Sequence, residues 1–314
     1  MIAADAPGMR LDAFLALRLE GYSRSHLKDL IGRGFVEVDG AARSPDYRLR
    51  EQDERVAVDF PEVSWRAEPG EFEDWVIHED ESLIVLHKPA GLLMHPLGPS
   101  WLETPRAALS EPSANLAGLV QLHRPELIRA GLDRCGLVHR LDRQTSGVLL
   151  LAKTRAAQAT LVEEFKEREV EKIYRAIVCG SPEAGAASIS APIGRAPGHR
   201  RVVVTPFGKT AETGFKVLAR SEIATLVEAR PLTGRTHQIR AHLGFLGHPV
   251  AGDPEFTPKT PLPEPLRPPR TMLHAYCISF RHPASGKLRS FQAEPPADFK
   301  AFWRKCRAYR GPRK

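Results

Sequence analysis

The feature that most constrains this chain is a short polar loop between two apolar, strand-like segments within residues 137–151. The loop carries Asp142 in the run His-Arg-Leu-Asp-Arg-Gln-Thr-Ser-Gly, and an aliphatic segment follows directly. A charged side chain at the end of an apolar strand is costly to hold unless it is paired or faces a cleft, so such a loop is a natural place for chemistry. Considered alone, Asp142 is better explained as a residue that caps a turn or a helix.

Length and charge set outer limits on the fold. The chain has 314 residues, is 42% hydrophobic and contains no run near the length of a membrane span, which predicts one substantial core plus a smaller module and no membrane association. The formal net charge of +7 suits a polyanionic partner without establishing one. A stretch rich in proline, glycine and acids predicts a linker at residues 63–74, between a small domain at 1–62 and a large one at 75–314.

The cysteines and the N-terminus point to a cytoplasmic protein. Asp5, Arg10 and Asp12 interrupt the N-terminal segment, so no secretory signal is visible. The four cysteines lie far apart without a C-x-x-C pair, which predicts buried free thiols and a reducing compartment. They are Cys135, Cys179, Cys277 and Cys306. We expect a monomer.

Two helices are predicted in the small domain. Apolar residues recur at helical spacing over residues 11–19, with Gly21 as a stop. A second helix is expected to begin after Ser23, to bury one apolar face, and to end at Gly32 or Gly34.

Short strands follow these helices at residues 35–38 and 55–58, with a tight turn at Asp39-Gly40. Arg24 and Lys28 flank the apolar face of the second helix and are candidate RNA contacts. The unit resembles the small RNA-binding module named after ribosomal small-subunit protein four. The alternative is a generic α/β unit with a solvated basic edge.

The large domain is rich in strands, with helices inserted rather than strictly alternating. Strands are predicted at residues 75–78, 83–87, 172–178, 212–218, 224–229 and 272–280. Thr154 can cap a helix that runs to about Glu169 and buries Ala157, Leu161, Val162 and Phe165. Because no parallel βα alternation is present, we expect an α+β fold with a mixed, largely antiparallel sheet and packed helices. Residues 97–134 and 258–270 carry no clear signal of a regular element.

The whole run around Asp142 resembles the central motif of the RluA-type pseudouridine synthases, in which the Asp is the essential catalytic residue. Further stretches agree with the family in the expected order, and the match spans residues 75–299. They are residues 86–96 (Leu-His-Lys-Pro-Ala-Gly), 171–178 (Glu-Lys-Ile-Tyr), 233–242 (Thr-Gly-Arg-Thr-His-Gln-Ile-Arg), 246–253 (Leu-Gly-His-Pro-Val-Ala-Gly-Asp) and 273–275 (Leu-His-Ala).

This resemblance implies an isomerase with the pseudouridine synthase fold. The reaction breaks the bond from ribose to the ring nitrogen of uridine, turns the base, and rejoins the sugar to ring carbon five. Because nothing is oxidised, reduced or hydrolysed, the stoichiometry requires no cofactor and no metal. Asp142, if ionised, could attack the sugar, attack the uracil ring or remove a sugar proton, and these routes stay open.

The resemblance also supplies two partners for Asp142. A buried Asp tends towards its neutral form, and a neighbouring guanidinium opposes this, which is the role expected of Arg240. Thr236 is the expected cap of the Arg240 helix. Tyr174 matches the family residue that stacks on the target base and is implicated in proton transfer. Without the resemblance, Arg240 would be better explained as an exposed helix arginine and Tyr174 as core filler.

Several further residues have two explanations. Arg140 matches a family residue that inserts into the RNA near the flipped nucleotide, but it could equally be a salt-bridge partner for its loop. Arg235 is assigned to positioning or phosphate contact, and His139 to a hydrogen-bonded framework. His237 and His242 lie five residues apart, unlike the pair in H-E-x-x-H, which argues against a metal site.

Three classes of function compete. The leading hypothesis is an RNA pseudouridine synthase that acts on large-subunit ribosomal RNA, because such N-terminal modules accompany many family members with that substrate; transfer RNA is the alternative. A non-catalytic RNA-binding relative would have lost the Asp, Tyr or Arg, and all three are present. A hydrolytic glycosidase generally needs a second carboxylate or a metal, and the central loop offers only Asp142.

Removal of residues 1–62 tests the small domain. We expect RNA binding to weaken and the slope of log affinity against log salt to become shallower. A protein that makes fewer phosphate contacts releases fewer counterions from the RNA when it binds. Filter binding at several salt concentrations measures both. An unchanged affinity and slope would reject an RNA-binding role for this domain.

Overall fold

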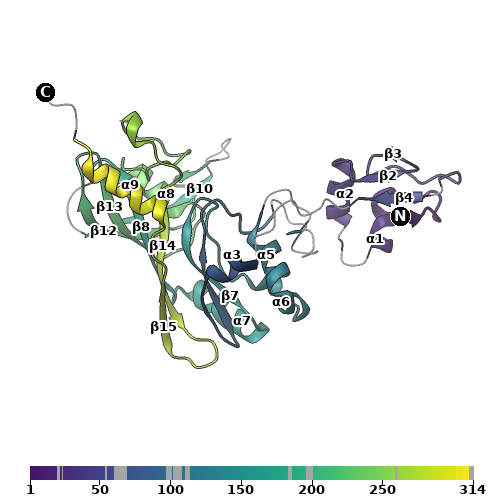
Figure 1. The fold of residues 1–314 in the computed structure, drawn as a ribbon, viewed down its shortest axis with the longest axis horizontal. Helices are drawn as coiled ribbons and strands as arrows, with labels where there is room; N and C mark the ends of the chain where they lie inside the picture. The colour runs from purple at the N-terminus through teal and green to yellow at the C-terminus, as the bar shows by residue number, and fades with distance from the viewer. Residues whose placement is uncertain are drawn as a thin grey trace. The chain divides into compact units, whose positions relative to one another are not determined.

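The computed structural model describes residues 1–19, 22, 24–53, 55–59, 69–96, 101, 108–109, 114–182, 186–195, 201–258 and 261–310 (Figure 1). These residues form two compact units, one of residues 1–74 with 92–137 and the other of residues 75–91 with 138–314. The division at residue 74 coincides with the end of the expected linker. The expected continuous domain over 75–314 is instead interrupted, because residues 92–137 make their contacts with the first unit.

The N-terminal part of the first unit contains two helices and a four-stranded sheet in the order β1-β4-β2-β3. Its elements are β1 (Ile2–Ala3), α1 (Leu11–Arg18), α2 (Arg24–Gly32), β2 (Val36–Val38), β3 (Ala41–Ala42) and β4 (Arg55–Val58). Leu27, Leu30 and Ile31 of α2 are buried in one core with α1 and the strands, as expected from their spacing. The expected helix boundaries Gly21 and Ser23 lie outside the described residues.

A buried carboxylate fixes the basic residues of this core. The side chain of Asp12, on α1, is fully buried, and it pairs with Arg10 Nε at 3.2 Å, Arg24 Nη2 at 3.0 Å and Lys28 Nζ at 3.6 Å. Burial opposes the charge of Asp12, but hydrogen bonds from Arg10 and Arg24 lower its pKa from 3.8 to about 2. Arg24 and Lys28 remain half-exposed, so Asp12 orients both cations without removing them from the surface.

The low pKa of Asp12 predicts a pH-dependent effect of Asp12→Asn. Because the folded pKa lies below the unfolded one, the stabilisation by ionised Asp12 is complete above about pH 4 and disappears as the pH falls towards 2. The variant should reduce the stability of α1 and α2 by about 1–2 kcal/mol at pH 7. Hydrogen exchange of their amides measures this. A difference from wild type that stays constant down to pH 2 would contradict the assignment.

The rest of the first unit is more helical than the sequence pattern indicates. It contains α3 (Pro69–Asp74), α5 (Leu116–His123), α6 (Pro125–Arg129) and the 3₁₀ helix η2 (Asp133–Gly136). The expectation that residues 97–134 lack regular elements is therefore wrong from residue 116 onwards; residues 97–100, 102–107 and 110–113 lie outside the described part. Helix α5 is buried over six consecutive residues, so it has no amphipathic period to recognise.

Residues 69–74 also depart from the expected linker. Phe72, on α3, is fully buried and stacks on His123 with 4.7 Å between the ring centroids. Glu73 pairs with Arg124 Nη1 at 2.7 Å. These contacts join α3 to α5, which explains why a segment rich in acids and proline still packs. The remainder of the expected linker, residues 63–68, lies outside the described residues.

The second unit is built on a nine-stranded sheet in the order β5-β6-β7-β14-β8-β13-β12-β9, with β15 paired to β14. Its strands are β5 (Val76–Glu79), β6 (Leu83–Lys88), β7 (Ser146–Ala152), β8 (Glu171–Cys179), β9 (Ala186–Ser190), β12 (Glu212–Arg220), β13 (Ala224–Pro231), β14 (Leu273–Arg281) and β15 (Leu288–Gln292). A separate hairpin consists of β10 (Ile193–Arg195) and β11 (Val202–Val204). Among the strands that the structure describes, β7 and β14 pair in parallel and all other paired strands are antiparallel, so the expected mixed, largely antiparallel α+β fold is confirmed.

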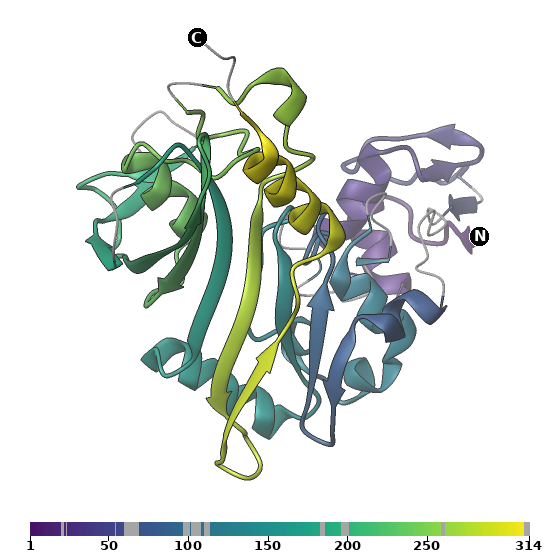
Figure 2. The ribbon, with the colours of Figure 1, turned by 60° about the vertical axis from the view of Figure 1, so that its left-hand side comes forward.

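Helices pack on this sheet (Figure 2). Helix α7 (Arg155–Glu167) covers β6, β7 and part of β14, while α8 (Gln238–Phe245) and α9 (Ala297–Ala308) cover β8 and β13. Thr154 caps α7, as expected, by accepting a hydrogen bond from Ala157 N at 3.1 Å. Val162, expected in the buried stripe of α7, is instead 44% exposed. The loop at 258–270 contains only the short 3₁₀ helix η3 (Glu264–Leu266) among its described residues.

A glycine brings the polar loop to the centre of the sheet. Gly147, at the start of β7, has φ of 121°, and a Cβ there would lie 2.1 Å from the carbonyl oxygen of Ala275 on β14. Only glycine can therefore occupy this position, and it lets β7 and β14 pair directly behind the loop that carries Asp142.

The structure also addresses two predictions from the sequence: that the cysteines are buried free thiols, and that the chain contains no membrane span. All four cysteines are buried and free, as the sequence predicts. In the described part of the chain, none of the helices combines the length and the apolar character that a membrane crossing requires.

Candidate active site

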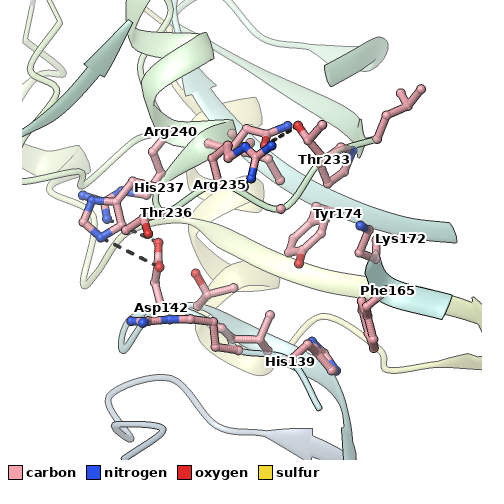
Figure 3. Close-up of a pocket in the computed structure, with 18 of the residues that line it drawn as sticks. His139, Asp142, Phe165, Lys172, Tyr174, Thr233, Arg235, Thr236, His237 and Arg240 are labelled. Atoms are coloured by element: carbon pink, nitrogen blue, oxygen red, sulfur yellow. Dashed lines mark hydrogen bonds and ion pairs between the residues drawn. The ribbon is translucent and has the colours of Figure 1, made fainter. Parts of the chain in front are cut away.

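A pocket of about 540 Å³ opens in the second unit and contains the expected site residues (Figure 3). Its walls come from the loop before β7, from α7, from β8, and from the segment that joins β13 to α8. The residues expected here from the sequence are Arg140, Asp142, Tyr174, Arg235 and Arg240, and all five line it. Arg24 and Lys28 belong to the first unit.

Asp142 and Arg240 meet in this pocket although 98 residues separate them in the sequence. Arg240 Nη1 donates to Asp142 Oδ2 at 3.3 Å. The side chain of Arg240 is only 7% exposed and that of Asp142 is 22% exposed, so the pair is partly shielded from water but still accessible from the pocket. The alternative that Arg240 is an exposed surface arginine is wrong. The guanidinium therefore meets, from inside the protein, a carboxylate that faces the pocket.

Two carboxylates that the sequence did not single out hold Arg240 in place. Asp253 accepts from Arg240 in a fork, at 2.6 Å from Nε and 2.9 Å from Nη2, and Glu255 accepts from Nη2 at 2.9 Å. Burial opposes the charge of Arg240, but these bonds and the nearby charge of Asp142 raise its pKa above the ordinary value. Asp253 ends one of the family-like segments, which is the only sequence signal for it.

His237 is a further pocket residue that sequence reasoning missed. Its Nε2 lies 3.8 Å from Asp142 Oδ1 and its Nδ1 lies 3.2 Å from Glu255 Oε1, so the ring stands between two carboxylates. It also occupies the N-cap position of α8, in a left-handed conformation with φ of 54°, where Thr236 was the expected cap. His242 bonds instead to Thr213 and to the carbonyl of Ala191, as a structural residue.

The side chain of Gln238, the first residue of α8, binds the segment that leads into the helix. Gln238 Oε1 accepts from Arg235 N at 2.9 Å and from Thr233 Oγ1 at 2.7 Å. Its amide nitrogen donates to Thr213 Oγ1 at 2.9 Å. Because three of its hydrogen bonds are fixed inside the protein, the backbone that leads into Arg240 has little freedom.

Tyr174 enters the pocket from β8, on the strand face expected from the sequence. Burial, and secondarily the negative charge of Asp142, raise the pKa of Tyr174 above its ordinary value. The hydroxyl therefore stays protonated at neutral pH and can donate a hydrogen bond. In Figure 3 its ring extends into the pocket, while the side chain is also packed against the core of the sheet.

Two buried cations hold the loop that carries Asp142. Lys88 Nζ, fully buried, donates to the carbonyls of Arg143 at 3.3 Å and Thr145 at 3.1 Å, and also to that of Pro89. Arg270 Nη1 donates to the carbonyl between them, that of Gln144, at 3.1 Å. Three consecutive loop carbonyls are thus fixed, and the loop cannot turn Asp142 away without breaking charge-assisted bonds.

Arg270 and Lys88 differ in the charges that lie near them. Arg270 is bound by Asp298 on α9, with Nε 2.6 Å from Oδ2. Burial and the charge of Arg270 lower the pKa of Lys88 to about 7, with Asp142 acting in the opposite direction. Arg270 and Arg240 thus bring positive charge to the backbone and to the carboxylate of the Asp142 loop.

The remaining sequence candidates take distinct places. His139 Nε2 accepts from Leu150 N at 2.9 Å and its ring stacks on Phe165, while burial and the charge of Lys172 lower its pKa to about 3. It is a neutral framework residue, as expected. Arg140 is exposed, and within the described ranges no carboxylate forms an ion pair with it. Arg235 Nε donates to the carbonyl of Thr210 at 3.1 Å.

Comparison with known families agrees with this fold and pocket. Residues 82–244 match the family model described as RNA pseudouridylate synthase, and residues 9–54 match that of the S4 domain. The chain therefore belongs to the RNA pseudouridine synthase family, whose members isomerise uridine to pseudouridine, and it begins with an S4 domain. The alternative of a generic N-terminal α/β unit is excluded.

Individual relatives are similar over nearly the whole chain. The Ribosomal large subunit pseudouridine synthase D of Neisseria meningitidis serogroup A is 39% identical over 308 residues, which are 95% of this chain and 78% of that protein. The protein of the same name from Nitrosomonas europaea is 37% identical over 94% of this chain and 83% of its own. The solved human RNA Pseudouridylate Synthase Domain Containing 4 shares the fold, with a TM-score of 0.61 and 24% identity over 76% of this chain and 95% of its own.

The two hydrogen bonds from Arg240 to Asp253 predict the effect of Asp253→Asn. The amide keeps the shape but not the charge, so Arg240 loses its strongest acceptor and Asp142 its fixed partner. We expect the single-turnover rate of pseudouridine formation to fall about 10- to 100-fold, corresponding to one charge-assisted hydrogen bond. Glu294→Gln, at an exposed acid, is the matched control. A folded Asp253→Asn protein with the wild-type rate would contradict the claim that Asp253 holds Arg240 in the position that the reaction needs.

Proposed function

We propose that this protein converts specific uridines of large-subunit ribosomal RNA to pseudouridine and that Asp142 is the residue that acts on the target nucleotide. The observation that carries the proposal is the 3.3 Å contact between Asp142 and Arg240 inside an open pocket. It places a carboxylate that a substrate can reach directly against a buried guanidinium.

The reaction can be followed atom by atom. The bond from C1′ to N1 breaks, the base turns, and C1′ bonds to C5; C5 loses a proton and N1 gains one, so no atom is added or lost overall. Asp142 serves this sequence as a nucleophile towards the sugar or the ring, or as the base that removes a sugar proton. Tyr174, protonated at neutral pH, stacks on the base and is suited to hydrogen-bond it.

The target uridine must leave its stack before it can enter the pocket, at a cost of about a few kcal/mol. Arg140 is exposed at the pocket and free to insert into the space that the base vacates. Arg235 is placed to contact the backbone. On the S4 domain, Arg24 and Lys28 provide further phosphate contacts.

The two competing classes of function have less support. A hydrolase would need a second carboxylate to activate water, but the two that share Arg240 with Asp142, Asp253 and Glu255, already accept hydrogen bonds from it. A non-catalytic RNA-binding protein would have no need for Asp142, Tyr174 and Arg240 around one pocket.

The choice of ribosomal RNA rests on the names of the relatives, which are large-subunit pseudouridine synthases over nearly the same length. Four buried free thiols suit a reducing, cytoplasmic location. The protein is proposed to work there as a monomer, with RNA as its partner and without a resident cofactor.

Pseudouridine mapping in cellular RNA tests the proposal. A strain without this protein is complemented with wild type or with Asp142→Asn, which keeps the shape of the side chain but cannot ionise. We expect particular large-subunit ribosomal uridines to lose modification in the deletion strain, to regain it with wild type, and to stay unmodified with Asp142→Asn. Sites restored by Asp142→Asn would refute the role of Asp142, and losses confined to transfer RNA would refute the substrate.

A further inference from the structure

The pocket extends well beyond the groups that the reaction uses. Asp142, His237 and Arg240 lie at one side of it, and Lys172 and Phe165 lie at the other, with Tyr174 between them (Figure 3). Lys166 and Arg168, one and three residues after Phe165 at the C-terminal end of α7, also line the pocket. Nothing in the isomerisation of a single uridine gives these far-side residues a task.

Lys172 is a cation without a counter-charge. It is half-buried, two residues before Tyr174 on β8, and no carboxylate in the described ranges lies within ion-pair distance of it. Its Nζ instead lies over the ring of Phe165, 5.9 Å from the centroid. Burial lowers the pKa of Lys172, because it removes water that would solvate the charge. Such uncompensated cations facing a pocket are typical of anion sites.

Arg168 is the second unusual residue at this end. It ends α7 in the left-handed conformation, with φ of 65° and ψ of 26°, where helices normally have glycine. A side chain there is unfavourable, yet Arg168 is exposed and lines the pocket. At both positions, therefore, a different residue would be more favourable for the stability of the folded protein.

Exposed apolar side chains accompany this charge. Val162, on α7, is 44% exposed, and Leu232, just after β13, is 49% exposed; both border the pocket. A base can pack against aliphatic side chains of this kind while its phosphate meets the cations. Proteins that bind single-stranded nucleic acid typically combine positive charge with a surface on which bases can pack.

We propose that the far side of the pocket, formed by Val162, Phe165, Arg168, Lys172 and Leu232, is a second nucleotide site. It holds a nucleotide next to the target uridine, with the phosphate at Lys172 and Arg168 and the base against Val162 and Leu232. The identification of this nucleotide as part of the substrate RNA rests on the proposed function. It gives the enzyme a preference for unpaired RNA beside the target, because a neighbouring nucleotide can enter the site only when it is free of its own stack.

Two charge-removing variants test the site: Lys172→Met and Arg168→Gly. Binding is measured in the full chain carrying Asp142→Asn, with in vitro transcribed large-subunit ribosomal RNA as the probe. We expect each variant to raise Kd about three- to tenfold and to reduce the slope of log affinity against log salt by about 0.7, the value for one phosphate contact on a single strand. Lys172→Arg, which keeps the charge, should restore binding. Lys300→Met, at an exposed lysine of α9, is the control.

Thermal melting separates a binding role from a structural one. Because Lys172→Met removes an unpaired charge and Arg168→Gly relieves the left-handed conformation, both variants should keep or raise Tm while RNA binding weakens. An unchanged Kd and slope, or weaker binding together with a lower Tm, would overturn the site. If the otherwise wild-type enzyme forms no pseudouridine in this RNA but both variants still weaken binding, the proposed function fails and the second nucleotide site stands.

Discussion

The burial of Arg240 is the constraint on which the active site depends. A guanidinium that is 7% exposed must have its donors satisfied, and Asp253, Glu255 and Asp142 together do this. Removing one partner from a buried ion pair typically costs about 3–5 kcal/mol. Arg240 therefore holds three segments together: the loop before β7, helix α8 and the segment after it. Of its three partners, only Asp142 also lines the open pocket, so the contact that stabilises the fold also presents a carboxylate to the pocket.

The loop of Asp142 is fixed from its other side by backbone contacts. Lys88 and Arg270 bind three successive carbonyls, and Gly147 allows the only parallel strand pair of the described sheet to form directly behind them. Through Asp298, which binds Arg270, helix α9 is coupled to the same loop. A carboxylate held by distant elements in this way needs little reorganisation when substrate arrives, which is the condition for efficient electrostatic catalysis.

The sequence predicted elements whose pattern is local and missed those whose role depends on distant contacts. Strands such as β8 and β14 and the capped helix α7 carry alternation, helical spacing or a cap within their own residues, and they form where expected. Helix α5 was missed because it is buried all round. Val162 has helical spacing with the core stripe but lines the pocket instead. Of the site, Asp142, Tyr174 and Arg240 came from family resemblance. His237 lies inside a family-like segment but was considered only as a metal ligand, and Glu255 has no local signal, because the contacts of both residues depend on distant parts of the chain.

A crystal structure of the Asp142→Asn protein bound to its target RNA is the most direct test of the central claim. It should show the target uridine out of its stack, with its base against Tyr174 and its reacting atoms facing residue 142, and Arg240 still forked to Asp253 and within hydrogen-bond distance of that residue. A uridine bound elsewhere, or an Arg240 turned away from residue 142 to contact RNA, would contradict the account.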